Sequence, residues 1–201
     1  MTSKILLSIA AAAAALMPLA AMGQVAPEKR PSTTSSAPAY KYEAYAGFAY
    51  TGLNQVNQSR HGLMGGDIAL TRDFTRHFGI TANGAYFRVA TGSNNPGSPT
   101  VVSIAAGPEF RSTLYGNVDG FVHVLLGGEH TGGEGMSPDV SFSAGFGGGL
   151  VYNLSQRWAI RASGDRMSDS FTLTTTNNNA NGWSPHTHYN ARATVGVVYR
   201  F

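Results

Sequence analysis

Hydrophobic and polar residues alternate along the chain from Tyr42 to its end, and the pattern is clearest in 190–201. Every second residue of this stretch is apolar: Ala191, Ala193, Val195, Val197, Tyr199 and Phe201. The residues between them are mostly polar and include Arg192 and Arg200. A β-strand sends successive side chains to opposite faces. The stretch is therefore predicted to be a strand with one apolar face and one polar face.

The same period of two predicts seven further strands, at about 43–50, 64–71, 80–87, 102–111, 118–127, 142–152 and 158–165. The connections between them alternate in length. Short links at 72–77, 112–117 and 153–157 alternate with longer ones at 52–60, 89–100, 129–139 and 168–188. Even strand numbers, short periplasmic turns and long external loops are typical of bacterial outer-membrane barrels. The pattern therefore predicts an all-β fold, an eight-stranded antiparallel up-and-down transmembrane β-barrel over residues 41–201.

The N-terminal residues 1–23 have the pattern of a secretory signal peptide. Lys4 precedes an apolar stretch from Ile5 to Leu16, and Ala21-Met22-Gly23 places small residues where a signal peptidase cleaves. An uncleaved N-terminal anchor is the alternative interpretation. Residues 24–40 are rich in Pro, Ser, Thr and Ala, a composition that buries too little apolar surface to fold, so they are predicted to be a flexible periplasmic leader.

Two absences in the sequence narrow the class of protein. The chain contains no cysteine, which excludes a disulfide scaffold and a lipid-anchored lipoprotein. Beyond residue 23 it has no run of about eighteen apolar residues, the length expected of a transmembrane helix. Any segment of the mature chain that crosses a membrane is therefore predicted to cross as a strand.

Three stretches resemble a known group of proteins: Ala-Gly-Pro-Glu-Phe-Arg at 106–111, Gly-Gly-Gly-Leu-Val-Tyr-Asn-Leu at 147–154 and Val-Val-Tyr-Arg-Phe at 197–201. They are similar to the small bacterial outer-membrane β-barrel superfamily of OmpA-type transmembrane domains, OmpX-like proteins and opacity-type surface proteins. The resemblance implies an outer-membrane location, with membrane lipid, the barrel-assembly machinery and periplasmic chaperones as partners. It also implies that Val197, Tyr199 and Phe201 form the signal that the assembly machinery reads.

Charged residues of the predicted strands fall on the less apolar row of each segment. A charge on the lipid face costs several kcal/mol near the bilayer midplane, so these residues are predicted to face the barrel interior. Eight strands enclose an interior that side chains just fill. Unpaired charges there would be heavily penalised. A structural network of ion pairs is therefore predicted, with carboxylates against guanidiniums: Glu43, Asp67, Glu109 and Asp165 with Arg161 and Arg192.

The sequence contains little evidence for a catalytic or metal-binding site. The lumen carboxylates could in principle act as acids and bases, or line a gated ion path, but packing in a closed lumen is the favoured interpretation. His186 and His188 could share one face of a strand and bind a metal, although no carboxylate or cysteine is close in sequence. Ser163 lies near Asp165 without a histidine in its segment. We therefore predict no catalytic residue, no metal and no cofactor, and the 13 basic against 11 acidic residues that remain without Lys4 do not suggest nucleic-acid binding.

Two further expectations concern local structure. Aromatic residues gather near the predicted strand ends, as in the interface girdles of membrane barrels. They include Tyr42, Phe78, Phe110, Tyr152 and Trp158 at the periplasmic side and Tyr50 and Tyr86 at the outer side. Pro108 lacks an N–H group and should not fit a regularly paired strand, so a β-bulge is predicted there.

The leading hypothesis for function is a non-enzymatic outer-membrane protein that supports envelope integrity and displays loops for surface contact or adhesion. The loop at 168–188, which contains Trp183, is the predicted contact surface for an extracellular partner. Three alternatives remain: a small porin-like passive channel, a lipid-modifying outer-membrane enzyme, and a soluble lipocalin-like barrel. In the last of these the apolar row would face inward and the charges outward.

Overall fold

A computed structural model of the chain describes residues 40–54, 60–89, 98–169 and 190–201. The predictions for residues 1–23 and for 24–39, His186, His188 and most of the 168–188 loop lie outside the described residues and stay predictions. The described part contains no helix of the length and hydrophobicity needed to cross a membrane.

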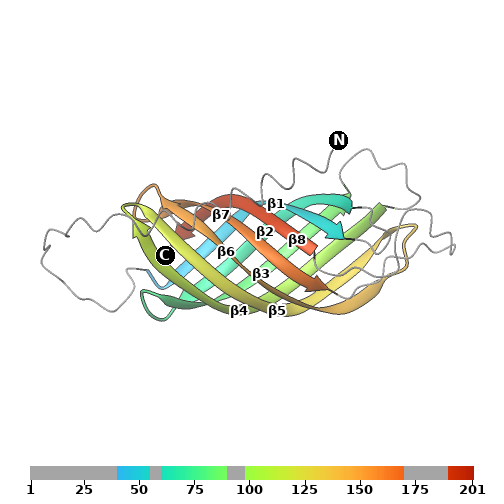
Figure 1. Ribbon diagram of the computed structural model, residues 1–201, viewed down its shortest axis with the longest axis horizontal. Helices are drawn as coiled ribbons and strands as arrows, with labels where there is room; N and C mark the ends of the chain where they lie inside the picture. The colour runs from blue at the N-terminus through green and yellow to red at the C-terminus, as the bar shows by residue number, and fades with distance from the viewer. Residues whose placement is uncertain (1–39, 55–59, 90–97, 170–189) are drawn as a thin grey trace, which may run out of the picture. The chain divides into compact units, whose positions relative to one another are not determined.

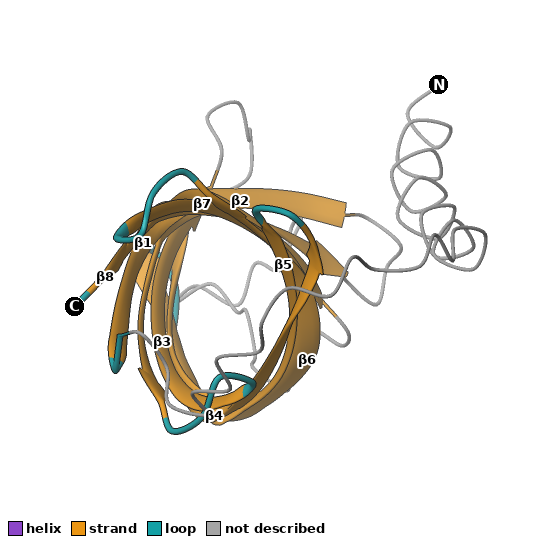
Figure 2. Ribbon diagram, turned by 90° about the vertical axis from the view of Figure 1, so that its left-hand side faces the viewer, coloured by secondary structure: helices purple, strands orange, loops and turns teal. Residues whose placement is uncertain are grey.

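The described residues form one closed antiparallel β-barrel of eight strands, in which each strand pairs with its neighbours in sequence and β1 pairs with β8 (Figure 1; Figure 2). The strands are β1 (Tyr42–Asn54), β2 (Arg60–Asp73), β3 (Phe78–Val89), β4 (Ser98–Tyr115), β5 (Val118–Glu134), β6 (Asp139–Asn153), β7 (Trp158–Asp169) and β8 (Asn190–Arg200). The fold class predicted from the sequence is confirmed.

The barrel closes between its first and last strands. Tyr42 N–H donates to Phe201 O at 3.1 Å, and Phe201 N–H donates to Tyr42 O at 3.0 Å. The rings of the same two residues stack with their centroids 5.7 Å apart. The C-terminal segment therefore completes the hydrogen-bond ladder, so that the barrel has no open edge between β1 and β8.

One end of the barrel, here called the turn end, carries the tight turns and both ends of the described chain. Its connections are Phe74–His77, Gly116–Asn117 and Leu154–Arg157, and Gly116 adopts a left-handed φ of 51°. In the first of these turns Thr75 Oγ1 accepts a hydrogen bond from Phe78 N–H at 3.0 Å. The opposite end is called the loop end.

The alternation read from the sequence matches the burial of the side chains in every strand. Outward residues such as Ile104, Phe142 and Phe146 are between 62% and 70% exposed, whereas inward residues such as Leu63, Leu125 and Val151 are at most 1% exposed. A soluble barrel would bury its apolar side chains in the interior, whereas here they are exposed around the outside. The inside and outside faces therefore agree with the membrane interpretation and not with the lipocalin-like alternative.

Three local predictions were wrong, one of them the short link at 112–117, of which only 116–117 connect β4 to β5. There is no bulge at Pro108: the pairing runs through Ile80 opposite Pro108, and the β4–β5 register is the same on both sides of it, with the only shift between Thr113 and Tyr115. Pro108 points outward, so its missing donor interrupts the ladder without requiring an extra residue. The predicted loop at 129–139 is mostly strand, because β5 extends to Glu134 and only 135–138 connect it to β6. His130, expected in that loop, is therefore a strand residue.

Candidate functional site in the barrel lumen

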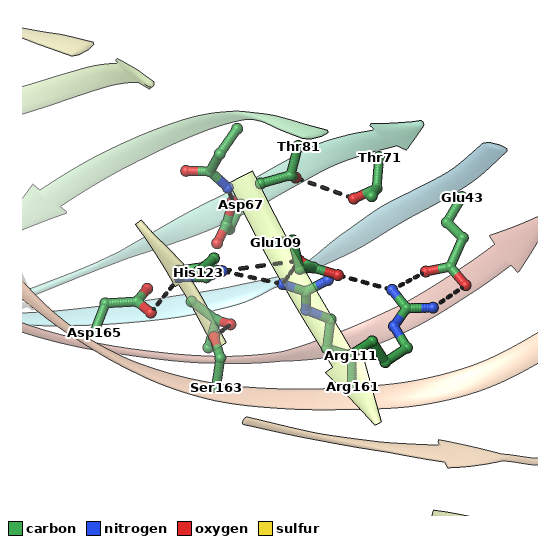
Figure 3. Close-up of polar contacts among 12 residues, drawn as sticks. Glu43, Asp67, Thr71, Thr81, Glu109, Arg111, His123, Arg161, Ser163 and Asp165 are labelled. Atoms are coloured by element: carbon green, nitrogen blue, oxygen red, sulfur yellow. Dashed lines mark hydrogen bonds and ion pairs between the residues drawn. The ribbon is translucent and has the colours of Figure 1, made fainter. Parts of the chain in front are cut away.

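The polar side chains of the inward face form a chain of ion pairs that begins near the turn end (Figure 3). Arg111 donates from both terminal nitrogens to the carboxylate of Glu43, at 2.5 and 2.6 Å. Arg200 Nε donates to the same carboxylate at 2.5 Å, and Arg111 also donates to Glu109 at 2.8 Å. This turn-end cluster joins β1, β4 and β8. Bidentate arginine–carboxylate pairs of this kind are the strong form of charged hydrogen bond.

Glu109 links this cluster to the middle of the lumen. Its second oxygen accepts a hydrogen bond from Arg161 at 2.9 Å, and the guanidinium of Arg161 lies over the ring of Phe121, 3.7 Å from its centroid. Both charged groups are buried, Glu109 at 2% and Arg161 at 5% exposure. The pair and the aromatic face together hold the arginine across the narrow interior.

A second cationic position follows toward the loop end. Arg192 donates from Nε to Asp165 at 2.9 Å and from Nη1 to Asn83 Oδ1 at 3.0 Å. The amide nitrogen of Asn83 in turn donates to Asp67. Asp165 Oδ1 also forms a hydrogen bond with His123 Nε2, at a distance of 2.8 Å. This middle group ties β2, β3, β5, β7 and β8 together through side chains alone.

The loop-end part of the lumen is different, because it holds two carboxylates and no guanidinium of its own. Glu129 is 6% exposed and Asp169 is 2% exposed. Asp169 accepts hydrogen bonds from Ser143 Oγ and, at 2.9 Å, from the Asn190 amide. Glu129 Oε2 is buried and has no hydrogen-bond partner in the part of the chain that the structure describes. Glu129, Ser141, Ser143, Asp169 and Asn190 are called the loop-end group below.

The structure places all six residues of the predicted network inside the barrel: Glu43, Asp67, Glu109, Arg161, Asp165 and Arg192. Two of the carboxylates have partners other than the predicted arginines. Glu43 pairs with Arg111 and Arg200 instead of Arg161 or Arg192, and Asp67 is held by the neutral amide of Asn83. Sequence alone gives the face of each residue, whereas its height in the lumen depends on the register between strands.

Sequence reasoning missed Glu129 and Asp169 as lumen residues. Glu129 was assigned to a loop, yet it continues the inward row of β5 that includes Phe121, His123 and Leu125. Extending the alternation through Gly127 and Gly128 would have found it. Asp169 lies at the end of β7, four residues after the inward Asp165, so the same extension of the pattern would have placed it.

The described residues show no arrangement that favours hydrolysis. Ser163 Oγ is hydrogen bonded to Thr194 Oγ1 at 2.7 Å, and both ring nitrogens of His123 face charged groups, with Asp165 at 2.8 Å and Arg161 at 3.5 Å. A general base needs a nucleophile within hydrogen-bond reach, and His123 has none among these contacts. No group of three or more His, Cys, Asp or Glu residues in the described ranges could hold a metal ion.

The free space inside the barrel is unevenly distributed. A cavity of about 560 Å³ opens at the turn end, where its lining includes Asp73, Arg76, His77, Asp119 and Arg200. Two cavities farther along the lumen, both lined by described residues, measure about 10 Å³ each, one beside Asp67 and Asp165 and one beside Glu129 and Asp169. Each of these holds about one water molecule. The described side chains thus fill the middle of the lumen.

The outer face carries the features of a bilayer contact. Ring pairs line the turn end: Trp158 with Tyr199 at 4.8 Å and Phe78 with Phe110 at 5.0 Å between centroids. Aliphatic and aromatic residues cover the strands above them, among them Ile68, Ile104, Val124 and Phe146. An apolar band with an aromatic girdle is typical of transmembrane barrels.

Comparisons with known proteins agree with this class of fold. The chain matches no known family model and no curated protein sequence. Among solved structures it is similar to Neisserial surface protein A, with 12% identity over 80% of this chain and 97% of that one and a TM-score of 0.64. It is also similar to OprG of Pseudomonas aeruginosa, with 10% identity over 83% and 98% and a TM-score of 0.58. Ail, the attachment invasion locus protein of Yersinia pestis, matches with 17% identity over 81% and 99% and a TM-score of 0.53.

The fold is therefore that of the small bacterial outer-membrane barrels, which confirms the resemblance seen in the sequence. The three neighbours match over nearly their whole lengths, so the described chain corresponds to an entire barrel of this kind. At these identities the likeness establishes the fold of the chain. Its activity has to be argued from its own residues.

Proposed function

We propose that the chain is a non-enzymatic protein of the bacterial outer membrane, a narrow barrel with a filled lumen that strengthens the envelope and displays loops. One observation carries this proposal: in the described residues, ion pairs cross the lumen and the cavities beside and beyond them measure only about 10 Å³, while exposed apolar side chains cover much of the outer face. A filled interior favours a structural or display role over transport, and the nearby solved structures include a surface protein and an attachment protein.

The membrane part of the proposal is tested by refolding residues 24–201 into detergent micelles. Closed barrels resist unfolding in cold detergent, so the folded form is expected to change its gel mobility only after boiling, and to aggregate when detergent is withheld. A monomer that stays soluble without detergent would contradict the proposal.

The display part concerns the loop at 168–188, which is proposed to contact an extracellular partner. Ail has been solved with a heparin analogue, sucrose octasulfate. For the present chain, a strain that lacks residues 170–189, which leaves β7 and β8 intact, and that assembles the barrel normally is expected to lose adhesion or phage sensitivity. Unchanged behaviour in both assays would remove the loop from the proposal.

A passive channel is the second candidate, favoured by the polar lining of the lumen and the open cavity at the turn end. Planar bilayers distinguish the two. We expect no steady conductance from the wild-type barrel, because the pairs among Glu43, Glu109 and Arg111 lie across the interior. Stable unit conductance steps would favour the channel.

Val197, Tyr199 and Phe201 are proposed to act in assembly. Val197 and Phe201 are 47% and 54% exposed on the outer face, where another protein can reach them before the barrel enters lipid. Phe201→Ala keeps the backbone bonds to Tyr42. It is expected to lower the amount of barrel assembled in cells while leaving refolding in detergent nearly unchanged. Equal losses in both settings would indicate a purely structural role.

A further inference from the structure

The buried charges of the lumen do not balance. Six carboxylates are buried inside the described barrel: Glu43, Asp67, Glu109, Glu129, Asp165 and Asp169. Four guanidiniums face them, those of Arg111, Arg161, Arg192 and Arg200. His123 is the remaining group that can carry positive charge, and it lies against Asp165 and Glu109 in the middle of the lumen. The excess negative charge is therefore left near the loop end.

Two carboxylates share a small space there. Glu129 and Asp169 line the same cavity of about 10 Å³, together with Thr51 and Asn190. Ser143 lies between them, since it donates to Asp169 and also interacts with Glu129. Arg192 borders this cavity and its charge attracts both carboxylates, but its hydrogen bonds go to Asp165 and Asn83 on the side of the middle group. Like charges in a poorly hydrated interior repel each other strongly unless something neutralises them.

Two buried oxygens of the loop-end group have no hydrogen-bond partner among the described residues. Glu129 Oε2 has no hydrogen-bond partner although the residue is only 6% exposed. The hydroxyl of Ser141, directly opposite Glu129 in the β5–β6 ladder, is also buried without a partner. A buried carboxylate oxygen without a donor is rare, because it loses its water without compensation. Such an oxygen is a ready ligand for a cation.

From this geometry we infer that the loop-end group binds one hard cation, held by the carboxylates of Glu129 and Asp169 in the cavity that both of them line. All these ligands are oxygens, the donors that calcium, magnesium and sodium prefer. The site does not need a third carboxylate, because water and the side-chain oxygens of Thr51 and Asn190, which line the same cavity, can complete the coordination. Calcium is the first candidate, since magnesium demands a strict octahedron and keeps several waters, for which a cavity of about 10 Å³ has little room.

The test measures calcium binding to the refolded mature chain, residues 24–201, in a zwitterionic detergent without lipopolysaccharide. After treatment with a chelator, equilibrium dialysis against labelled calcium is expected to show about one ion per barrel. Glu129→Gln and Asp169→Asn are each expected to weaken binding at least tenfold. Glu134→Gln serves as the matched control, because Glu134 is an exposed glutamate of the same strand, and it is expected to bind like the wild type.

Heat-dependent gel mobility gives a second readout that does not require isolation of a bound ion. Calcium is expected to raise the temperature of the mobility shift for the wild type and for Glu134→Gln, but not for Glu129→Gln. In chelator, Glu129→Gln should be at least as heat resistant as the wild type, because the repulsion is gone. Magnesium and sodium in parallel samples identify which ion the site prefers.

Three results would overturn the inference. The first is a wild-type barrel that binds no calcium, magnesium or sodium above the level of empty micelles. The second is unchanged calcium binding in Glu129→Gln. The third is stabilisation of the wild type by acid in the absence of any bound metal ion, which would show that a proton shared by the two carboxylates neutralises the group.

Discussion

The two halves of the lumen use the same kinds of side chain in opposite ways. Toward the turn end, the two fully buried carboxylates each meet guanidiniums: Glu43 has two, Arg111 and Arg200, and Glu109 has Arg111 and Arg161. Toward the loop end, Glu129 and Asp169 face hydroxyls and an amide instead. One half is held by charge pairs that cross the barrel, and in the other the described residues form no ion pair with the two carboxylates. The comparison shows that an inward polar row gives no information about whether its charges are paired.

The largest expected effect comes from breaking the turn-end cluster. Arg111→Met leaves Glu43 with one partner and removes a partner of Glu109, and losing one member of a buried ion pair costs about 3–5 kcal/mol. The free energy of unfolding in urea, measured in lipid vesicles, is expected to fall by that amount. Arg157→Met is the control, because Arg157 lies in an exposed turn. A loss below about 1 kcal/mol in Arg111→Met would mean that the cluster does not hold the strands together.

A smaller effect is expected from crowding the interior where β6 approaches β7. A Cβ atom at Gly149 would lie 2.0 Å from the carbonyl oxygen of Ala162 and 2.8 Å from Cα of Ser163. Since backbone cannot move aside easily, Gly149→Ala is expected to cost about 1–3 kcal/mol in the same urea measurement.

Gly164→Ala is the matched control for this substitution. It lies on the neighbouring strand, and a Cβ atom there would meet nothing within 4 Å. Equal stability of the two variants would show that the strands separate at little cost and that the interior is less tightly packed than its distances indicate.

The smallest expected effect, with the opposite sign, is at the loop end. Glu129→Gln, studied with a chelator present, removes a charge that has no guanidinium partner. The free energy of unfolding is expected to stay equal or to rise by up to about 1 kcal/mol. A clear loss of stability would mean that Glu129 is compensated within the barrel, and the contrast between the two halves would disappear.

Much of this architecture could be predicted from sequence because a strand has a side-chain period of two. One slip of register would move every residue of a strand to the wrong face, so the alternation is strongly constrained wherever one face meets lipid. It therefore gave the correct face for Glu43, Asp67 and Arg192 without any contact information. It failed at strand ends, where Gly127 and Gly128 made the continuing strand look like the start of a loop.

Sequence by itself determined the strand number, the inward and outward faces and the membrane class of the fold. These follow from local periodicity and from the length of the connections. Only the tertiary structure decided which charges meet. Glu43 and Arg200 are 157 positions apart and pair because closure of the barrel sets β1 beside β8 with these two residues opposite each other. The register of each strand pair fixes the height of a side chain in the lumen, and a one-dimensional pattern contains no information about that height. For the same reason, the unpaired state of Glu129 became visible only when the eight strands were placed together.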